Sequence, residues 1–184
     1  MKEISPAGGV RLINSGPVIV VTCGPVDSPN AITLAWSMVV SRQPPLVAVA
    51  VALRHFSHDL ILDGGAFVIN VPNKSHIQAV VTCGTRSGSD GDKFAPAGIT
   101  PVKAEKVPTV YIKEFPGRLE CVLFKSQIAG DHRLFIGEVK AAYADEEAFG
   151  DHWLTSCEKA HLLHHLGGPN FAVADNTITA RSGK

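Results

Sequence analysis

The sequence predicts a mainly β protein, a β-barrel or β-sandwich with a few peripheral helices. Runs that alternate with period two or are rich in β-branched residues, each bounded by turn-forming residues, recur along the first two-thirds of the chain. Helical patterns are short, so strand–helix alternation is too weak for a doubly wound parallel sheet. The chain has 184 residues, of which 45% are hydrophobic, enough for one domain with a sizeable core. We therefore expect a single domain over residues 1–184.

Four strands are predicted in the first half of the chain, at 17–24, 31–39, 46–53 and 66–71. The strand at 31–39 has two unlike faces. One face is large and apolar (Ile32, Leu34, Trp36, Met38 and Val40), and the other is small and partly hydroxylated (Ala31, Thr33, Ala35 and Ser37). The small face suits close packing of a helix or a second subunit, or a flat aromatic ligand held by a few polar groups.

Three more strands are predicted in the second half, at 109–115, 119–129 and 133–144. The last two are joined at the sequence GDH, which places His132 at the tip of a hairpin. A smaller hairpin is expected around Asp175 and Asn176. Helices are expected at 58–63 with Ser57 as N-cap, at 75–82 after Asn73, and from Glu146 towards His165.

The long C-terminal helix would align Cys157, His161 and His165 at i, i+4 and i+8. Thiolate and imidazole are zinc ligands, so a metal site is an alternative for this stripe. However, positions i and i+8 lie more than two turns apart, which is too far for one ion. We therefore predict no metal site.

Composition excludes several functional classes. Lys plus Arg equals Asp plus Glu at 17 each, so no bulk basic charge favours nucleic acid. No apolar run approaches the 18 residues of a membrane span, and the N-terminus lacks the apolar region of a signal peptide, so we expect a cytoplasmic protein. Neither a GxGxxG fingerprint after a strand nor a P-loop occurs. The four scattered cysteines are expected to be free thiols.

Two loops are suited to anions. Ser57, preceded by Arg54 in RHFSHD, is placed to cap a helix whose N-terminus can bind a phosphate. The Gly-rich segment CGTRSGSDGDKF adds Arg86, Ser87 and Lys93, and its glycines let backbone amides approach a phosphate. Taken separately, Ser57 could simply cap a helix, and the Gly-rich segment could simply be a surface loop. Together with the flat face, they predict a flat, phosphorylated cofactor.

The chain resembles the flavin reductase-like proteins with an FMN-binding split β-barrel, including the flavoredoxins. The landmarks are NAITLAWSMVVSRQPPLVAVAV, RHFSHDLI, FVINVP, CGTRSGSDGDKF, GDHRLFIGEV and HLGG, and the likeness extends from about Ser15 to Arg181. It implies an antiparallel split β-barrel of six or seven strands with a few peripheral helices. It also implies a homodimer that binds FMN noncovalently at the subunit boundary.

The resemblance implies a set of site residues. Asn30, Thr33, Ala35, Trp36 and Ser37 follow the isoalloxazine and ribityl chain, with Leu34 and Gly84 in the same set. Arg54, Ser57, Ser87 and Lys93 lie near the phosphate, with Phe94 packed close by. His132 positions the nicotinamide of NAD(P)H. Phe171 stands where many relatives have Tyr, which removes a hydroxyl there.

The resemblance implies an NAD(P)H-dependent flavin oxidoreductase that passes electrons from flavin to an acceptor. Two alternatives stay open: a flavoredoxin-like carrier that shuttles electrons between protein partners, and a protein that binds flavin without turnover. The sequence separates them poorly, because the flavin carries the redox chemistry and the protein supplies binding and orientation.

Overall fold

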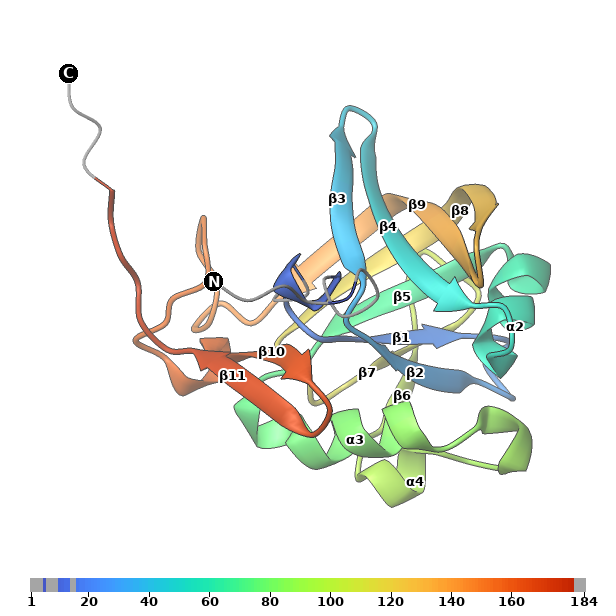
Figure 1. Ribbon diagram of the computed structural model, residues 1–184, viewed down its shortest axis with the longest axis horizontal. Helices are drawn as coiled ribbons and strands as arrows, with labels where there is room; N and C mark the ends of the chain where they lie inside the picture. Colours follow the sequence, from blue (N-terminus) through green and yellow to red (C-terminus); the bar gives the residue numbers. More distant parts are fainter. Residues whose placement is uncertain (1–4, 6–9, 14–15, 181–184) are drawn as a thin grey trace.

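The computed structural model describes residue 5 and residues 10–13 and 16–180. Its main feature is a seven-stranded sheet in the order β2-β1-β5-β8-β9-β4-β3, in which all pairs are antiparallel (Figure 1). The fold is therefore mainly β, as the sequence pattern predicts, and antiparallel, as the resemblance implies. The strands of this sheet are β1 Ile19–Cys23, β2 Asn30–Leu34, β3 Ser37–Arg42, β4 Pro45–Ala52, β5 Ala66–Val71, β8 Gly117–Ala129 and β9 His132–Ala144.

Smaller elements surround the sheet. Two two-stranded sheets pair β6 with β7 and β10 with β11. Their bounds are β6 Pro101–Lys103, β7 Val110–Ile112, β10 Leu162–Gly167 and β11 Asn170–Ala174. The α-helices are α2 Phe56–Gly64, α3 Ile77–Thr85 and α4 Phe94–Ala97, and the 3-10 helices are η1 Val10–Ile13, η2 Lys74–His76, η3 Gly88–Asp90 and η4 Glu158–Ala160. The described part of the chain contains no helix with the length and hydropathy of a membrane span.

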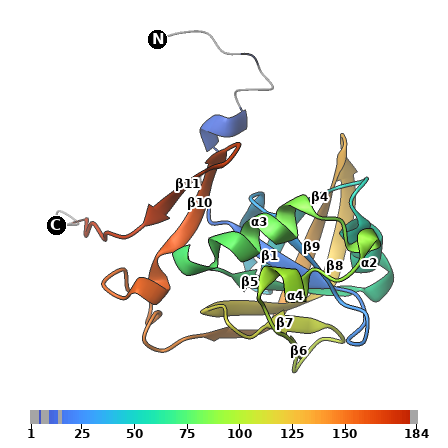
Figure 2. The same ribbon diagram turned by 90° about the horizontal axis from the view of Figure 1, so that it is seen from below.

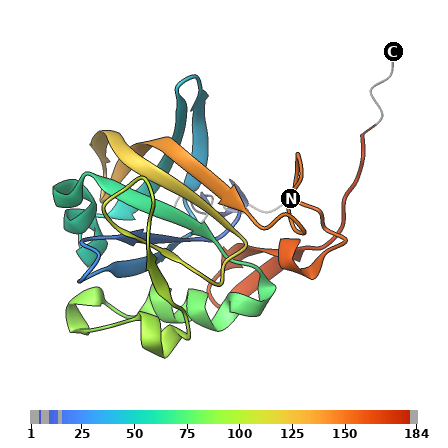
Figure 3. The same ribbon diagram turned by 180° about the vertical axis from the view of Figure 1, so that it is seen from behind.

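The prediction of one strand over 31–39 is wrong, because the chain turns a corner at Ala35 and Trp36. Before the corner β2 pairs with β1, and after it β3 pairs with β4. These are the two outer strands of the seven-stranded sheet. In a flat sheet they would lie roughly 30 Å apart, whereas the step from Leu34 to Ser37 spans at most about 11 Å. The sheet must therefore curl until its edges approach, as in a barrel (Figures 1 and 3).

The curled sheet encloses the main core. Strands β1, β2, β4, β5, β8 and β9 all contribute buried side chains, among them Val21, Val49, Phe67 and Phe135. A second cluster packs α3 and α4 against the other side of β1 and β2 through residues such as Val20, Val80 and Phe94. The cysteines are free thiols, and burial raises the pKa of Cys23 to about 12.

The two short helices near the sheet edge form as predicted, with one correction. Asn73 starts the η2–α3 segment, because its side chain accepts a hydrogen bond from the backbone N–H of Ser75 at 3.0 Å. Ser57, however, is not the N-cap of α2, because the helix begins at Phe56, two residues before the predicted start, with His55 in the capping position. Ser57 instead lies inside the first turn, where it is buried.

The predicted helix from Glu146 towards His165 is wrong. Residues 162–167 form β10, which pairs with β11. The backbone groups bond across the chain rather than along a helix: Val18 N–H donates to the Leu163 carbonyl at 2.7 Å, and Lys74 N–H donates to the His161 carbonyl at 2.8 Å. Tertiary pairing therefore overrides the local pattern. Figure 2 shows the β10–β11 hairpin beside α3.

Two further predictions fail with that helix. The hairpin turns between Gly167 and Asn170 rather than around Asp175 and Asn176, and Gly167 and Gly168 supply the positive φ angles of 115° and 57°. The stripe of Cys157, His161 and His165 does not exist, since no helix carries it. Within the described residues, no group of three or more His, Cys, Asp or Glu is placed to hold a metal ion.

Candidate functional site

Strand β2 is an outer strand of the sheet, and its side away from β1 lies beside α3. Buried Lys93 donates through Nζ to the carbonyl of Ala31 at 2.6 Å and to the carbonyl of Cys83 at 3.3 Å. The Ala31 carbonyl therefore points away from β1. Alternate residues of an antiparallel strand direct their backbone groups to the same side, so those of Thr33 also point outward. Thr33 is tied to α3 by its hydroxyl, which donates to the Val80 carbonyl at 2.6 Å.

A polar cavity of about 270 Å³ lies between β2, the start of α2 and the loop after α3. It brings together six of the predicted cofactor residues: Asn30, Arg54, Ser57, Gly84, Ser87 and Lys93. Arg54, Arg86 and Lys93 give its wall three cationic side chains, and no acidic residue is among the described residues that line it. Such a cavity is suited to an anion.

Asn30 forms the floor of this polar cavity with an unsatisfied acceptor. Its Nδ2 donates to Ser57 Oγ at 2.7 Å, whereas its buried Oδ1 has no partner among the described residues. Buried polar atoms are normally paired, so this one is a candidate to accept from a ligand hydroxyl. Gly88 keeps the loop close to the floor, since a Cβ there would collide with the Asn30 amide and lie 2.9 Å from Phe56.

An apolar cavity of about 530 Å³ adjoins the polar one, and Gly84 and Thr85 line both. Thr33 and Ala35 form part of its wall, while Asn30 and Ile32, on the alternate face of β2, line the polar cavity. The tip of the β10–β11 hairpin closes the other side. The apolar cavity is lined by Val18, Thr33, Ala35, Val80, Val81, Gly84, Thr85, His165, Gly168, Pro169 and Phe171.

Trp36 and His132 meet at the corner between β2 and β3. Their ring centroids are 4.7 Å apart, and the Trp36 side chain is still 44% exposed. The Nδ1 of His132 lies 2.7 Å from Asp131 Oδ1, and this imidazole lowers the pKa of the Asp131 carboxyl. His132 is the first residue of β9, as the predicted hairpin requires.

Electrostatics favour negative charge at the rim of the polar cavity. Burial lowers the pKa of His55, and Coulomb interactions with Arg54, His132 and Lys93 lower it further. Burial also lowers the pKa of Lys93. The Lys93 ammonium has three N–H donors, of which two bind carbonyls, so one is left for another acceptor.

Comparisons with known proteins give the family of this chain. The family model described as flavin reductase like domain matches residues 11–168. This chain belongs to the flavin reductase-like family. A protein of Archaeoglobus fulgidus is 37% identical over 114 residues, which cover 62% of this chain and 64% of that protein. Protein YddH of Escherichia coli is 32% identical over 175 residues, 92% of this chain and 93% of YddH.

Solved structures of the family share the fold. The flavoredoxin of Desulfovibrio vulgaris (Miyazaki F) superposes with a TM-score of 0.81 at 27% sequence identity, covering 90% of each chain. The antiparallel sheet described above is thus that of flavin reductase-like split barrels.

Some predicted residues of this flavin reductase-like chain lie outside both cavities. Leu34 belongs to the core inside the barrel, and Phe94 packs in the cluster beneath α3 and α4. Ser37 begins β3, beyond the corner. Conversely, the cavities include His55, Phe56 and His165, which sequence reasoning did not select. The motifs RHFSHD and HLGG contain these residues, but their contact with the site depends on the course of α2 and β10.

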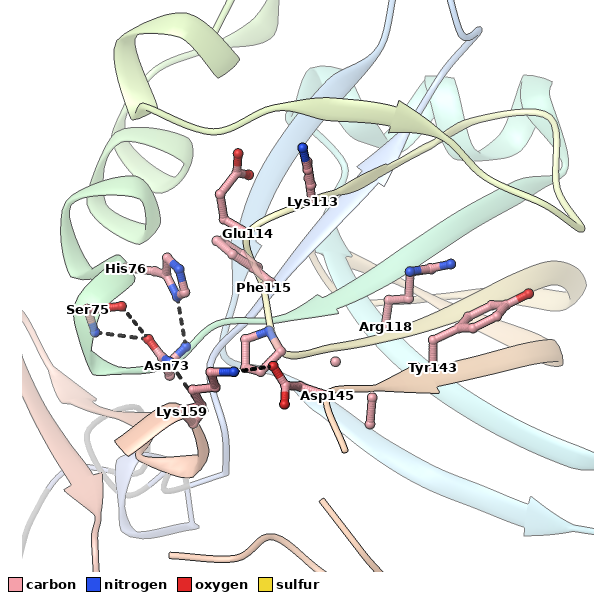
Figure 4. A pocket seen from close by; sticks show the side chains of 13 residues that line it. Asn73, Ser75, His76, Lys113, Glu114, Phe115, Arg118, Tyr143, Asp145 and Lys159 are labelled. Atoms are coloured by element: carbon pink, nitrogen blue, oxygen red, sulfur yellow. Dashed lines mark hydrogen bonds and ion pairs between the residues drawn. The ribbon is translucent and has the colours of Figure 1, made fainter. Parts of the chain in front are cut away.

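A third pocket, of about 430 Å³, lies at the far end of the β8–β9 ladder from His132, and Figure 4 shows its lining. None of the predicted site residues lines it. Several of its polar groups already have partners: Lys159 binds Asp145 at 2.8 Å, and His76 Nδ1 accepts from Asn73 N–H at 3.2 Å. We therefore take the two cavities beside β2 as the candidate functional site.

Proposed function

We propose that this protein binds FMN noncovalently and moves electrons from NAD(P)H to the flavin and on to an acceptor. One observation carries the proposal: a cationic polar cavity and an apolar cavity are joined at Gly84 and Thr85 beside β2. A phosphorylated flat cofactor matches this pair of cavities, because its phosphate tail is anionic and its aromatic ring is broad and apolar. The membership of the flavin reductase-like family supports this assignment.

The polar cavity is the proposed phosphate and ribityl site. Arg54, Ser57, Ser87 and Lys93 would hold the phosphate, with help from Arg86. The orphaned Oδ1 of Asn30 would accept from a ribityl hydroxyl. Hydrogen bonds that involve a charged partner are about twice as strong as neutral ones, so the phosphate contacts contribute most of the polar affinity.

The apolar cavity is the proposed ring site. Thr33, Ala35 and Gly84 offer small side chains, and the outward backbone groups of Thr33 can pair with the polar edge of a heterocycle. Phe171 adds an aromatic wall. When bound, the flavin supplies the hydride and electron chemistry, and the residues of this chain bind and orient it.

His132 is the proposed nicotinamide-positioning residue. It projects from the start of β9 against Trp36 at the corner of β2 and β3. Its imidazole would hydrogen-bond the carboxamide and hold the nicotinamide within about 3–3.5 Å of the flavin. Hydride transfer requires no proton from His132, so its role is binding rather than acid–base catalysis.

A homodimer is part of the proposal. On β3, the side chains of Met38 and Val39 are 60% and 73% exposed, and Val40 beside them is 41% exposed. Exposed apolar side chains that adjoin one another mark interaction surfaces. The β3–β4 hairpin projects from the barrel (Figure 1) and begins directly after Trp36, so a second copy seated on it would border the proposed flavin site.

A flavoredoxin-like electron carrier is the second candidate, favoured by the structural likeness to flavoredoxin. Addition of FMN to the purified protein, followed by NADH or NADPH without oxygen, distinguishes the two. Bleaching of the bound flavin band by a nicotinamide supports the reductase. A band that only dithionite or a protein donor can bleach supports the carrier, and absence of flavin binding contradicts both.

A further inference from the structure

A chain of four side chains connects helix α2 with strands β9 and β8. His58 Nδ1 lies 2.7 Å from Asp59 Oδ1, and its Nε2 lies 2.9 Å from Arg133 Nε. Arg133 also donates through a terminal N–H to Ser126 Oγ at 3.1 Å. The His58 side chain is only 9% exposed and packs edge-on against Phe135 at 5.6 Å.

The donors and acceptors of this chain fix the state of His58. The Nε of arginine can only donate, so His58 Nε2 must carry no hydrogen. The single proton of the imidazole therefore sits on Nδ1, where it is donated to Asp59. In this tautomer, His58 on α2 can accept a hydrogen bond from Arg133 on β9.

Arg133 directly follows the proposed nicotinamide-positioning residue. Successive side chains of a strand point to opposite faces, so Arg133 anchors one face of β9 while His132 meets Trp36 on the other. At its other end, the bond reaches α2, whose first residues Phe56 and Ser57 line the polar cavity. One hydrogen bond thus joins the helix of the proposed phosphate site to the strand that carries His132.

We propose that His58 is a positioning residue that acts through Arg133 to hold His132 against Trp36. This inference rests on the proposed function for its effect on catalysis, although the position of His132 itself can be measured without a ligand. His58→Phe keeps an aromatic ring and removes the acceptor, whereas His58→Gln restores an acceptor near the position of Nε2. His152 pairs with Asp151 as His58 does with Asp59, but on the exposed surface, so His152→Phe is the matched control.

The ligand-free measurement uses tryptophan emission. The chain has two tryptophans, so Trp153→Phe leaves Trp36 as the reporter of its contact with His132. In that background we expect His58→Phe to change the Trp36 emission, and His58→Gln and His152→Phe to leave it unchanged. Unchanged emission in His58→Phe would overturn the proposal, whatever the protein does with flavin.

The kinetic measurement follows reduction of bound FMN by NADH and by NADPH without oxygen. We expect His58→Phe to slow reduction about tenfold at unchanged FMN affinity, with recovery in His58→Gln, because small misplacements of a positioning group are costly. A loss of FMN affinity with normal reduction of the bound flavin would overturn the proposal by placing the effect in the cofactor pocket. If neither nicotinamide reduces the wild-type flavin, the reductase function fails, and the Trp36 emission alone decides the role of His58.

Discussion

Lys93 and Ser87 meet the polar cavity in different ways. The ammonium of Lys93 is buried and already bound to the carbonyls of Ala31 and Cys83, so it supports the join between β2 and α3 as well as the cavity wall. Ser87 lies on the loop and bonds only within it, to Ser89 at 2.7 Å. A Lys93 variant could therefore lose FMN either because the β2–α3 contact is weakened or because a phosphate contact is lost. A Ser87 variant tests the phosphate contact alone.

Ser87→Ala is expected to weaken FMN binding about tenfold or more. The reason is the loss of a hydrogen bond to a charged phosphate, which contributes roughly 1.5–3 kcal/mol. Titration of the apoprotein with FMN, followed by flavin fluorescence, measures the change. Ser156→Ala, on an exposed loop, is the control. Equal affinities in Ser87→Ala and wild type would place the phosphate elsewhere.

His132→Ala is expected to slow reduction by NAD(P)H by about tenfold to a hundredfold, because the nicotinamide loses its positioning contact. FMN affinity and reduction by dithionite should stay near wild type. Anaerobic stopped-flow absorbance gives the rate, with His152→Ala as the exposed-histidine control. Loss of flavin would assign His132 to the cofactor site, and a full rate would leave it a solvated neighbour of the turn.

The sequence motifs predict which residues line the polar cavity better than they predict the contacts of those residues. Six predicted residues line the polar cavity, because the motifs that carry them meet around β2. The sequence predicts Ser57 as an N-cap, but α2 begins at Phe56. The Ser57 hydroxyl instead accepts a hydrogen bond from Asn30. His55 and His165 lie in the motifs RHFSHD and HLGG, but only neighbours that are distant in the sequence bring them to the cavities.

At the scale of elements, the cavity wall requires that the loop after α3 lie very close to β2 and α2. The loop after α3 passes so near β2 and α2 that Gly88 has no room for a side chain, and a Cβ on Gly84 would lie 3.2 Å from Thr33 Cβ. Small residues thus allow the helix, loop and strand to form one continuous wall for both cavities.

Gly88→Ala tests that wall. The added methyl group would push against Asn30 and Phe56, and overpacking of this kind costs about 1–3 kcal/mol. We expect the Kd for FMN to rise roughly fivefold to a hundredfold, measured by the same titration. Gly150→Ala has open space around it and should bind FMN like wild type. Wild-type affinity in Gly88→Ala would show that Asn30 lies away from the ligand.

Strands with clear alternation were predictable, and the elements that depend on distant partners were not. The runs at 66–71, 119–129 and 133–144 became β5, β8 and β9 with small shifts at their ends. The corner at Ala35 and Trp36 has no Gly or Pro to mark it, and curling of the sheet imposes it. The C-terminal hairpin escaped prediction because its backbone pairs with residues nearly 90 or more positions away.

At the scale of the whole molecule, the exposed apolar side chains of Met38, Val39 and Val40 on β3 predict self-association. Val39→Asp should shift the protein from dimer towards monomer, because a charge at the centre of an apolar contact is left unpaired on association. Sedimentation velocity measures the shift. Ile178→Asp, which also removes an 89% exposed apolar side chain but lies far along the chain, should leave the assembly unchanged. Equal sedimentation of Val39→Asp and wild type as dimers would exclude β3 from the interface.

The central claim is that a flavin lies across the two cavities, with its phosphate in the polar one. Riboflavin and FMN share the ring and ribityl chain and differ only in the phosphate. Parallel titrations of the wild-type apoprotein with the two compounds therefore isolate the polar cavity. We expect FMN to bind about a hundredfold more tightly than riboflavin, which corresponds to two hydrogen bonds to a charged group. Equal affinities, or no binding of either compound, would contradict the account.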